Sequence, residues 1–256
     1  WNQRATENRA NVQATTNDVY LRILEINTFV KTLQSLNLDP SKSIVDIGCG
    51  DGYSTCSIAN SMPKHNFLGI DYAPAMIENA YQLIETSFPA VKNRISFRVG
   101  DVTDLSQSLG TNRYDAILTD RCLINLSTPE LQYQAITDIA DHLNDGGYYV
   151  AIENFIEGNN NLNATRQAIG LPEIPVRWHN LFFKVDDFKY EALKSFSTVT
   201  IENFSSAYYY APRVVYSKLC QMRDEKPDYE HDIHKLAIDL PQHGDYSPIK
   251  LVILQK

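Results

Sequence analysis

The feature that most constrains the fold is a regular alternation of short apolar segments with amphipathic ones. Five apolar segments that read as strands recur at intervals of about 25 residues, and segments with helical spacing separate them. The strand segments are SIVDIG from Ser43, NFLGID from Asn66, RISFRVGD from Arg94, YDAILTD from Tyr114 and YYVAIEN from Tyr148. Because parallel strands need a long crossover between them, this alternation predicts an α/β fold with a parallel sheet covered on both faces.

The pattern loosens beyond Asn154. A polar stretch without a predicted element covers 157–183, and a helix near 186–195 and a sixth strand, FSTVTIENF, follow it. About 40 residues then precede the last apolar run, IKLVILQ. Neither an internal repeat nor a linker divides the chain, so we expect one domain with additions.

Composition limits the classes of function. The net charge of -8 and the pI of about 5.2 argue against nucleic acid as a partner. The four cysteines lack paired spacing, so we expect no zinc site, no disulfide framework and a reduced, cytoplasmic location. We expect no transmembrane segment, because no apolar run reaches roughly 18 residues. The chain starts at Trp1 rather than Met, which leaves open a further domain upstream.

The stretch SIVDIGCGDGYS joins a strand to a helix through a glycine-rich turn. Such turns usually hold phosphate, but Asp51 stands where a dinucleotide diphosphate would approach. Two more acids, Asp71 and Asp101, follow the second and third strands. S-adenosylmethionine fits this pattern, since it has a ribose and an adenine but no phosphate, and its sulfonium and ammonium groups favour nearby carboxylates. The alternatives are an NAD-binding protein, or helix-capping roles for Asp71 and Asp101.

Between Ser43 and Phe155 the chain resembles the class I S-adenosylmethionine-dependent methyltransferases. The resemblance is carried by VDIGCGDG, GIDYA, VGDV, YDAILTDRCLINL and LNDGGYYVAIEN. It implies a Rossmann-like, seven-stranded, mostly parallel sheet with helices on both faces and an antiparallel last strand. It implies one methyltransferase domain over 1–256, with an N-terminal helical lid in 1–40, a cofactor-binding core in 41–155 and an acceptor-side half in 156–256. In that half, a helical cap insertion is expected at about 205–245, between strands six and seven.

The resemblance also implies a set of cofactor-binding residues. They are Asp46, Gly48 and Gly50 on the methionine side, Asp71 on the ribose, Tyr72, Asp101 and Val102 around the adenine, Asp120 near the transferred methyl group, and Trp1 and Arg4 in the lid.

Acceptor residues are expected just beyond the carboxyl ends of the strands, where open α/β sheets bind ligands. Methylation of a hydroxyl needs a base, and His179 is the first candidate, followed by Asp120 and Glu153. The expected acceptor-binding residues are Arg121, Asn154, Trp178, Asn180, Tyr209 and Arg213. In the alternative interpretation, His179 holds its own loop and the tyrosines of the insertion pack on the sheet. A phosphate or carboxylate acceptor would need no base, and the two arginines would then matter more.

The acceptor class rests on a looser resemblance. DRCLINL, EGNNNLNATRQAIGL and WHN look like methyltransferases of bacterial polysaccharide and sugar biosynthesis, which implies O-methylation of a sugar or glycan. The alternatives are N-methylation of a small amine or amino-acid-like metabolite, and a catalytically silent module that binds the cofactor. We expect a small-molecule or glycan acceptor and no metal, and the oligomeric state stays open. The HDIH motif, with His231 and His234, reads as a solvated helix face.

Overall fold

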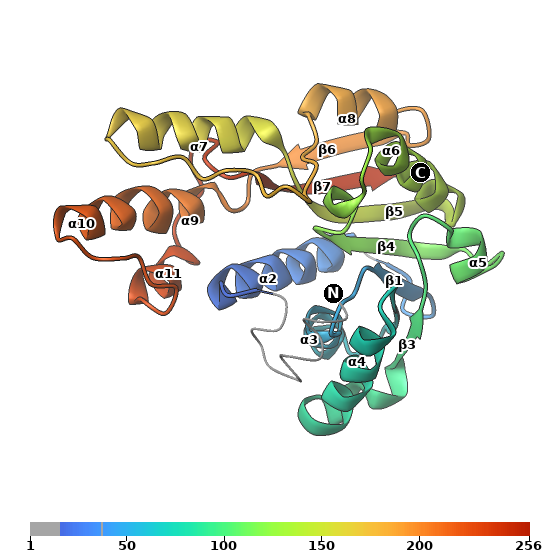
Figure 1. Cartoon of the computed structure of the whole chain (residues 1–256). Helices are drawn as coiled ribbons and strands as arrows, with labels where there is room; N and C mark the ends of the chain where they lie inside the picture. The colour runs from blue at the N-terminus through green and yellow to red at the C-terminus, as the bar shows by residue number, and fades with distance from the viewer. Residues whose placement is uncertain (1–15, 37) are drawn as a thin grey trace.

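The computed structural model describes residues 16–36 and 38–256. Its centre is a seven-stranded sheet of order β3-β2-β1-β4-β5-β7-β6 (Figure 1). The strands are β1 (Ser43–Ile47), β2 (Asn66–Asp71), β3 (Ile95–Val99), β4 (Tyr114–Asp120), β5 (Leu143–Asn154), β6 (Thr198–Glu202) and β7 (Ile249–Gln255). The first five pair in parallel, and β7 runs antiparallel to both of its neighbours, β5 and β6. The predicted Rossmann-like sheet with an antiparallel last strand is therefore confirmed.

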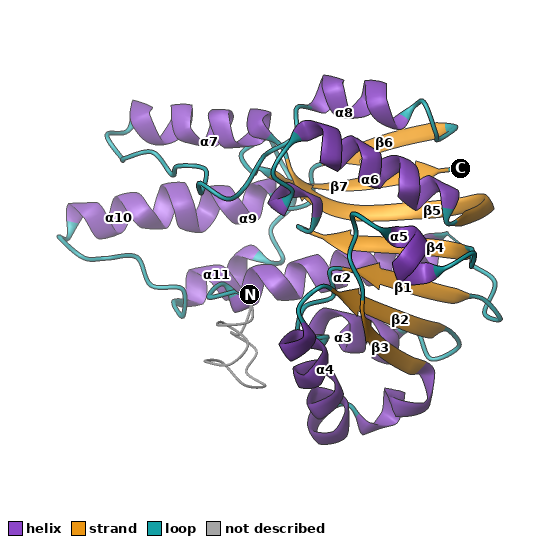
Figure 2. Ribbon diagram, turned by 45° about the vertical axis from the view of Figure 1, so that its right-hand side comes forward, coloured by secondary structure: helices purple, strands orange, loops and turns teal. Residues whose placement is uncertain are grey.

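Helices cover both faces of the sheet (Figure 2). Residues of α2 (Val19–Ser35), α3 (Tyr53–Ser61) and α4 (Pro74–Ser87) share one apolar cluster with alternate residues of the strands. Residues of α5 (Leu105–Leu109), α6 (Pro129–Asp141) and α8 (Val185–Ala192) share the second cluster with the remaining strand residues. This division follows from the alternation of side chains along a strand.

Helix α2 is a packed element of the core. Phe29 and Leu33 are each 1% exposed, and both belong to the apolar cluster on this face. The predicted N-terminal helix is thus present, and its described part is held by apolar burial. The polar residues of α2 that face inward contribute to the site described below.

A helical insertion joins β6 to β7, as predicted. It contains α9 (Ser206–Tyr210), the π-helical turn η3 (Ala211–Tyr216), α10 (Ser217–Met222) and α11 (Asp232–Ala237). Both ribbon views place α7 (Ile156–Ala168), α10 and α11 beyond the end of the sheet toward which β4 points (Figures 1 and 2). Ligands bind at this carboxyl edge in open α/β sheets.

Helix α7 was not predicted, because its sequence is rich in asparagine, which has a low helix propensity. The structure nonetheless forms a 13-residue helix here. Asn159, Leu162, Asn163 and Arg166 are buried at helical spacing, so one side of α7 packs against the protein. Tertiary contacts therefore override local propensity in this segment.

Two 3₁₀ turns complete the described elements: η1 (Pro89–Arg94) and η2 (Leu123–Asn125). Within the described part of the chain, no helix is long and apolar enough to cross a membrane. The same residues include no group of three or more His, Cys, Asp or Glu side chains arranged to hold a metal ion.

Candidate active site

Asp71 ties together the turns that follow β1 and β2. Its two carboxylate oxygens accept hydrogen bonds from the amides of Gly50 (3.0 Å) and Ala73 (2.9 Å). Burial raises the pKa of Asp71, and these two hydrogen bonds oppose the rise. The N-cap of α4 is Ala73, so Asp71 lies before the cap and does not occupy it. Each carboxylate oxygen keeps a further lone pair, which fits the predicted binding of ribose hydroxyls.

Only glycine fits at position 48, because the loop that follows β4 packs directly against it. Its φ of +75° lies in the left-handed region, and a Cβ atom placed on it would lie 2.5 Å from the Sγ atom of Cys122. The turns after β1 and β4 therefore touch at this point. The close contact brings the predicted cofactor loop next to Asp120 and Arg121.

The negative charge of Asp51 is balanced by an arginine of α2. The Arg22 guanidinium donates to its carboxylate at 2.7 Å, and both side chains are 5% exposed. The amide of Tyr53 donates to the same oxygen at 3.2 Å. Helix α2 therefore supplies the counter-charge of Asp51. The sequence gives no local signal for a pair separated by 29 positions.

Asp46 lies buried beneath the glycine loop. The Thr55 hydroxyl donates to its carboxylate at 2.5 Å. Burial raises the pKa of Asp46 to about 7; the Thr55 hydrogen bond opposes this rise, and the charges of Asp120 and Asp71 add to it. Three predicted cofactor carboxylates thus lie within electrostatic reach of one another.

Tyr72 and Asp101 lie beyond the ends of β2 and β3. The Tyr72 side chain is 54% exposed, and its pKa is raised by burial and by the charges of Asp71 and Asp101. The Asp101 carboxylate accepts from the amide and the hydroxyl of Thr103, each at 2.8 Å. Asp104, not Asp101, caps α5. Val102 beside them is buried. An exposed ring next to an exposed carboxylate suits the face and edge of an adenine.

Asp120 and Arg121 end β4 opposite α2. Arg121 has a positive φ of 51°, and its Nη2 atom donates to Glu25 Oε2 at 3.0 Å. Its Nε atom lies 3.5 Å from Asp120 Oδ1. Glu25 is fully buried. Burial raises its pKa to about 8 despite the attraction of Arg121. Sequence reasoning missed Glu25, because only the docking of α2 shows which of its polar residues point inward.

Glu25 should make the protein less stable as the pH rises from 6 to 8. Its folded-state pKa of about 8 lies above the ordinary value of 4.5, so the folded protein keeps a proton that the unfolded chain has released. The free energy of unfolding should therefore fall by about 1–2 kcal/mol over this range. Urea unfolding at both pH values tests this, with Glu25→Gln as the variant expected to show the smaller change. Equal pH dependence in the two proteins would contradict the assignment.

Glu153 supports the turn after β4. It is fully buried, and its carboxylate accepts from the amides of Cys122 (3.2 Å), Leu123 (3.0 Å) and Ile124 (3.4 Å) and from the hydroxyl of Thr119 (3.0 Å). Burial raises its pKa to about 7 against these hydrogen bonds. This geometry fits a residue that positions Cys122 and Leu123, rather than the predicted base. Its neighbour Asn154 is also buried.

The segment with Trp178, His179 and Asn180 lies next to the same turn. The amide of Leu181 donates to the carbonyl of Ile124 at 2.7 Å, and Asn180 Nδ2 donates to Asn125 Oδ1 at 3.1 Å. Trp178 is 96% exposed, and its ring meets that of His179 edge to face at 5.3 Å. His179 is exposed and has no hydrogen-bond partner among the described residues. The structure brings this segment to the carboxyl edge of the sheet, beside the turn after β4, and no hydrogen bond to the described residues orients the His179 ring.

The insertion places Arg213 and two tyrosines over the start of α2. Arg213 Nη2 donates to Asp18 Oδ2 at 2.7 Å, and its guanidinium carbon lies 4.2 Å from the centre of the Tyr209 ring. The Tyr208 hydroxyl donates to Asp18 Oδ1 and lies 3.1 Å from Nδ1 of His234. His234 is buried whereas His231 is exposed, so the interpretation of HDIH as a solvated face is wrong for His234 only. Trp1 and Arg4, the predicted lid residues, lie outside the described residues.

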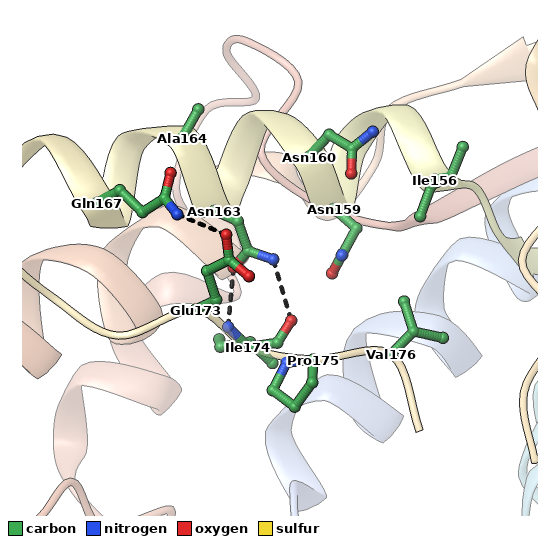
Figure 3. Close-up of a pocket in the computed structure, with 10 residues that line it drawn as sticks. All are labelled: Ile156, Asn159, Asn160, Asn163, Ala164, Gln167, Glu173, Ile174, Pro175 and Val176. Carbon is green, nitrogen blue, oxygen red and sulfur yellow. Dashed lines mark hydrogen bonds between the residues drawn. The ribbon is translucent and has the colours of Figure 1, made fainter. Parts of the chain in front are cut away.

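A pocket of about 330 Å³ lies between α7 and the loop that follows it (Figure 3). Five of its ten lining side chains carry an amide or a carboxylate: Asn159, Asn160, Asn163, Gln167 and Glu173. Asn163 holds the loop through two hydrogen bonds with the backbone of Ile174, at 2.9 and 3.0 Å. Asn159 is buried and points from α7 toward the loop (Figure 3).

Comparison with known proteins identifies the part of the chain that carries the glycine loop. Residues 44–147 match a methyltransferase domain. This match supports the predicted cofactor, S-adenosylmethionine. Two curated relatives are malonyl-[acyl-carrier protein] O-methyltransferases, from Anoxybacillus flavithermus (26% identical over 55% of this chain) and Paenibacillus sp. (32% over 42%). The chain spans 49% and 37% of their lengths.

Solved structures of methyltransferases share the fold over most of the chain. A complex of the Haloferax volcanii Trm112 methyltransferase activator with a methyltransferase matches at a TM-score of 0.57 and 14% identity, covering 99% of this chain and 96% of that one. Magnesium protoporphyrin IX methyltransferase from Synechocystis matches at 0.57 and 12%, covering 92% and 84%. The [4+2]-cyclase SpnF matches at 0.57 and 18%, covering 90% and 80%. The fold is thus shared with a protein that is named for another reaction.

Proposed function

We propose that this chain is an S-adenosylmethionine-dependent methyltransferase that methylates an oxygen of a sugar or glycan. The observation that carries the acceptor class is the amide-lined pocket beside α7 (Figure 3). Asn163 and Gln167 already bind Ile174 and Glu173. Asn159 and Asn160 are therefore the amides left to bind an acceptor, and asparagine both donates and accepts hydrogen bonds, as sugar hydroxyls do. Helix α7 begins directly after β5, so the Ile156 end of the pocket lies near the carboxyl edge of the sheet.

The cofactor-binding part of the proposal uses the residues around the glycine loop. The bound cofactor supplies a methyl group on a positively charged sulfur. We propose that Asp71 binds the ribose, that Tyr72 and Asp101 bind the adenine, and that the turn from Gly48 to Gly50 passes beside the methionine portion. The chain's main contribution to in-line transfer is positioning and exclusion of water.

Asp120 is the proposed base for a hydroxyl acceptor. It ends β4 at the ligand edge, and its Oδ1 atom is buried, forms no hydrogen bond among the described residues and is paired only with the Arg121 guanidinium, at 3.5 Å. Glu153 is engaged by backbone amides, and His179 is exposed. The same arrangement disfavours N-methylation of an amine, because Asp120 faces Arg121 and the oxygens of Glu153 are occupied.

The test is transfer from methyl-labelled S-adenosylmethionine to a panel of neutral sugars, acidic sugars, sugar phosphates, oligosaccharides and small amines. Label on a sugar supports the proposal. Label on amines alone would establish the N-methyltransferase alternative. Cofactor binding without transfer to any of these acceptors would favour the silent-module alternative.

His179→Ala should lower the turnover number by less than about 3-fold, because an exposed imidazole without a fixed orientation is poorly placed for proton transfer. Loss of a true general base costs about 10²- to 10⁴-fold. Steady-state kinetics on the labelled acceptor distinguish the two cases. Asp120→Asn is the matched comparison and should show the larger loss.

A further inference from the structure

Two arginines lie around Tyr209, between α2, the end of β4 and the insertion. Arg213 lies with its guanidinium carbon 4.2 Å from the centre of the Tyr209 ring. Burial raises the pKa of Tyr209 to about 12, and the positive charges of Arg213 and Arg121 oppose that rise. Both guanidinium groups therefore lie within electrostatic reach of one phenol, which stays protonated and able to donate.

Each arginine keeps one buried donor atom without a hydrogen-bond partner among the described residues. For Arg213 this atom is Nη1, since Nη2 binds Asp18. For Arg121 it is Nε, which lies 3.5 Å from Asp120 Oδ1 in an ion pair, while Nη2 binds Glu25. An unsatisfied buried donor costs about 1–3 kcal/mol. The Nη1 donor of Arg213, which has neither a hydrogen bond nor an ion pair among the described residues, is therefore costly for stability alone, and with the Tyr209 hydroxyl beside it suits an acceptor group with two oxygens.

The charges around the arginines favour an anion with one negative charge. Asp18 and Asp120 balance the two guanidinium groups. Glu25 adds little negative charge at neutral pH, since burial raises its pKa to about 8. A carboxylate therefore meets an approximately neutral site that offers two cationic donors. A doubly charged phosphate is repelled more strongly by the same aspartates.

We propose that the acceptor carries a carboxylate and that Arg121, Tyr209 and Arg213 bind it. The hydroxyl-bearing body of the acceptor then occupies the amide-lined pocket. Ile174 lines that pocket and packs against the large apolar cluster to which Tyr209 and Val214 also belong, and Arg166 of α7 donates to the carbonyl of Arg213, so the pocket helix contacts the insertion that carries Arg213. This inference rests on the proposed O-methyltransferase function and narrows its acceptors to acidic sugars, such as uronates.

The experiment measures acceptor binding to the protein loaded with S-adenosylhomocysteine. D-glucuronate and D-galacturonate are titrated beside their neutral parent sugars and D-glucose 6-phosphate, by calorimetry or ligand-observed NMR. At least one uronate should bind about 10-fold or more tightly than its parent sugar. Arg213→Gln should lose about 10- to 100-fold for that uronate, the value of one charge-assisted hydrogen bond, and little for the parent sugar.

Two further variants separate recognition from folding. Tyr209→Phe keeps the ring against Arg213 and removes only the hydroxyl, so a several-fold loss for the uronate is expected even where Arg213→Gln fails to fold. Arg223→Gln removes an exposed arginine just after α10 in the same insertion and should change nothing.

Four results would overturn the inference: equal binding of uronates and parent sugars, tighter binding of the phosphate, a uronate preference that survives both Arg213→Gln and Tyr209→Phe, or failure of both uronates to bind. Failure of the proposed function would appear separately, as absence of S-adenosylhomocysteine binding. Methyl transfer to neutral sugars, without a preference for uronates, would still agree with the proposed function.

Discussion

Asp71→Ala should weaken S-adenosylhomocysteine binding by about 100-fold or more. The Asp71 carboxylate anchors the amides of Gly50 and Ala73 and, in the proposed function, accepts the ribose hydroxyls. A hydrogen bond to a charged group contributes about 1.5–3 kcal/mol, so losing both ribose contacts already exceeds a 100-fold change. Release of the Gly50 amide loosens the turn that lies beside the ligand. Isothermal titration calorimetry measures the effect directly.

Asp104→Ala is the matched control for that experiment. Asp104 is exposed and caps α5 by accepting from the amide of Gln107 at 3.0 Å. Its loss should cost about 1 kcal/mol of stability and leave cofactor affinity unchanged. A folded Asp71→Ala protein that binds with wild-type affinity would remove Asp71 from the cofactor site and reopen the NAD alternative.

Arg22→Met should destabilise the protein by about 3–5 kcal/mol. Arg22 and Asp51 form an ion pair of 2.7 Å with both side chains 5% exposed. Removing one partner leaves the carboxylate of Asp51 buried without its counter-charge, which is the costly case for buried pairs. Urea unfolding followed by circular dichroism gives the change in the free energy of unfolding.

The double variant Arg22→Met with Asp51→Asn tests the reason for the loss. Neutralising Asp51 removes the uncompensated charge, so a substantial part of the stability should return. If the double variant were as unstable as the sum of the single variants, the two residues would act independently and the ion pair would not explain the effect.

The sequence predicted the parts of the fold that depend on local pattern. The strands through Asn154 contain short apolar or alternating segments, and the turns between them place Asp71 at the carboxyl end of β2, where the structure has it. Pattern alone could not predict α7, because its asparagines oppose a helix until one side is buried.

The pairing of charges was equally inaccessible to sequence reasoning. From the sequence, Asp51 is interpreted as an acid near the ligand. In the structure, α2 brings Arg22 to it. Glu153 and His179 are both predicted as candidate bases. The fold surrounds Glu153 with backbone amides, and it leaves His179 exposed. In each case the role depends on contacts between residues far apart in the chain.

One side of α2 joins three separate parts of the protein. Asp18, Arg22 and Glu25 are spaced at four and three residues, which places them along a single helical stripe. Asp18 binds the insertion through Arg213, Arg22 binds the turn after β1 through Asp51, and Glu25 binds the turn after β4 through Arg121. Because these three ion pairs all involve one helix, any shift of α2 changes the distances in all three regions at once.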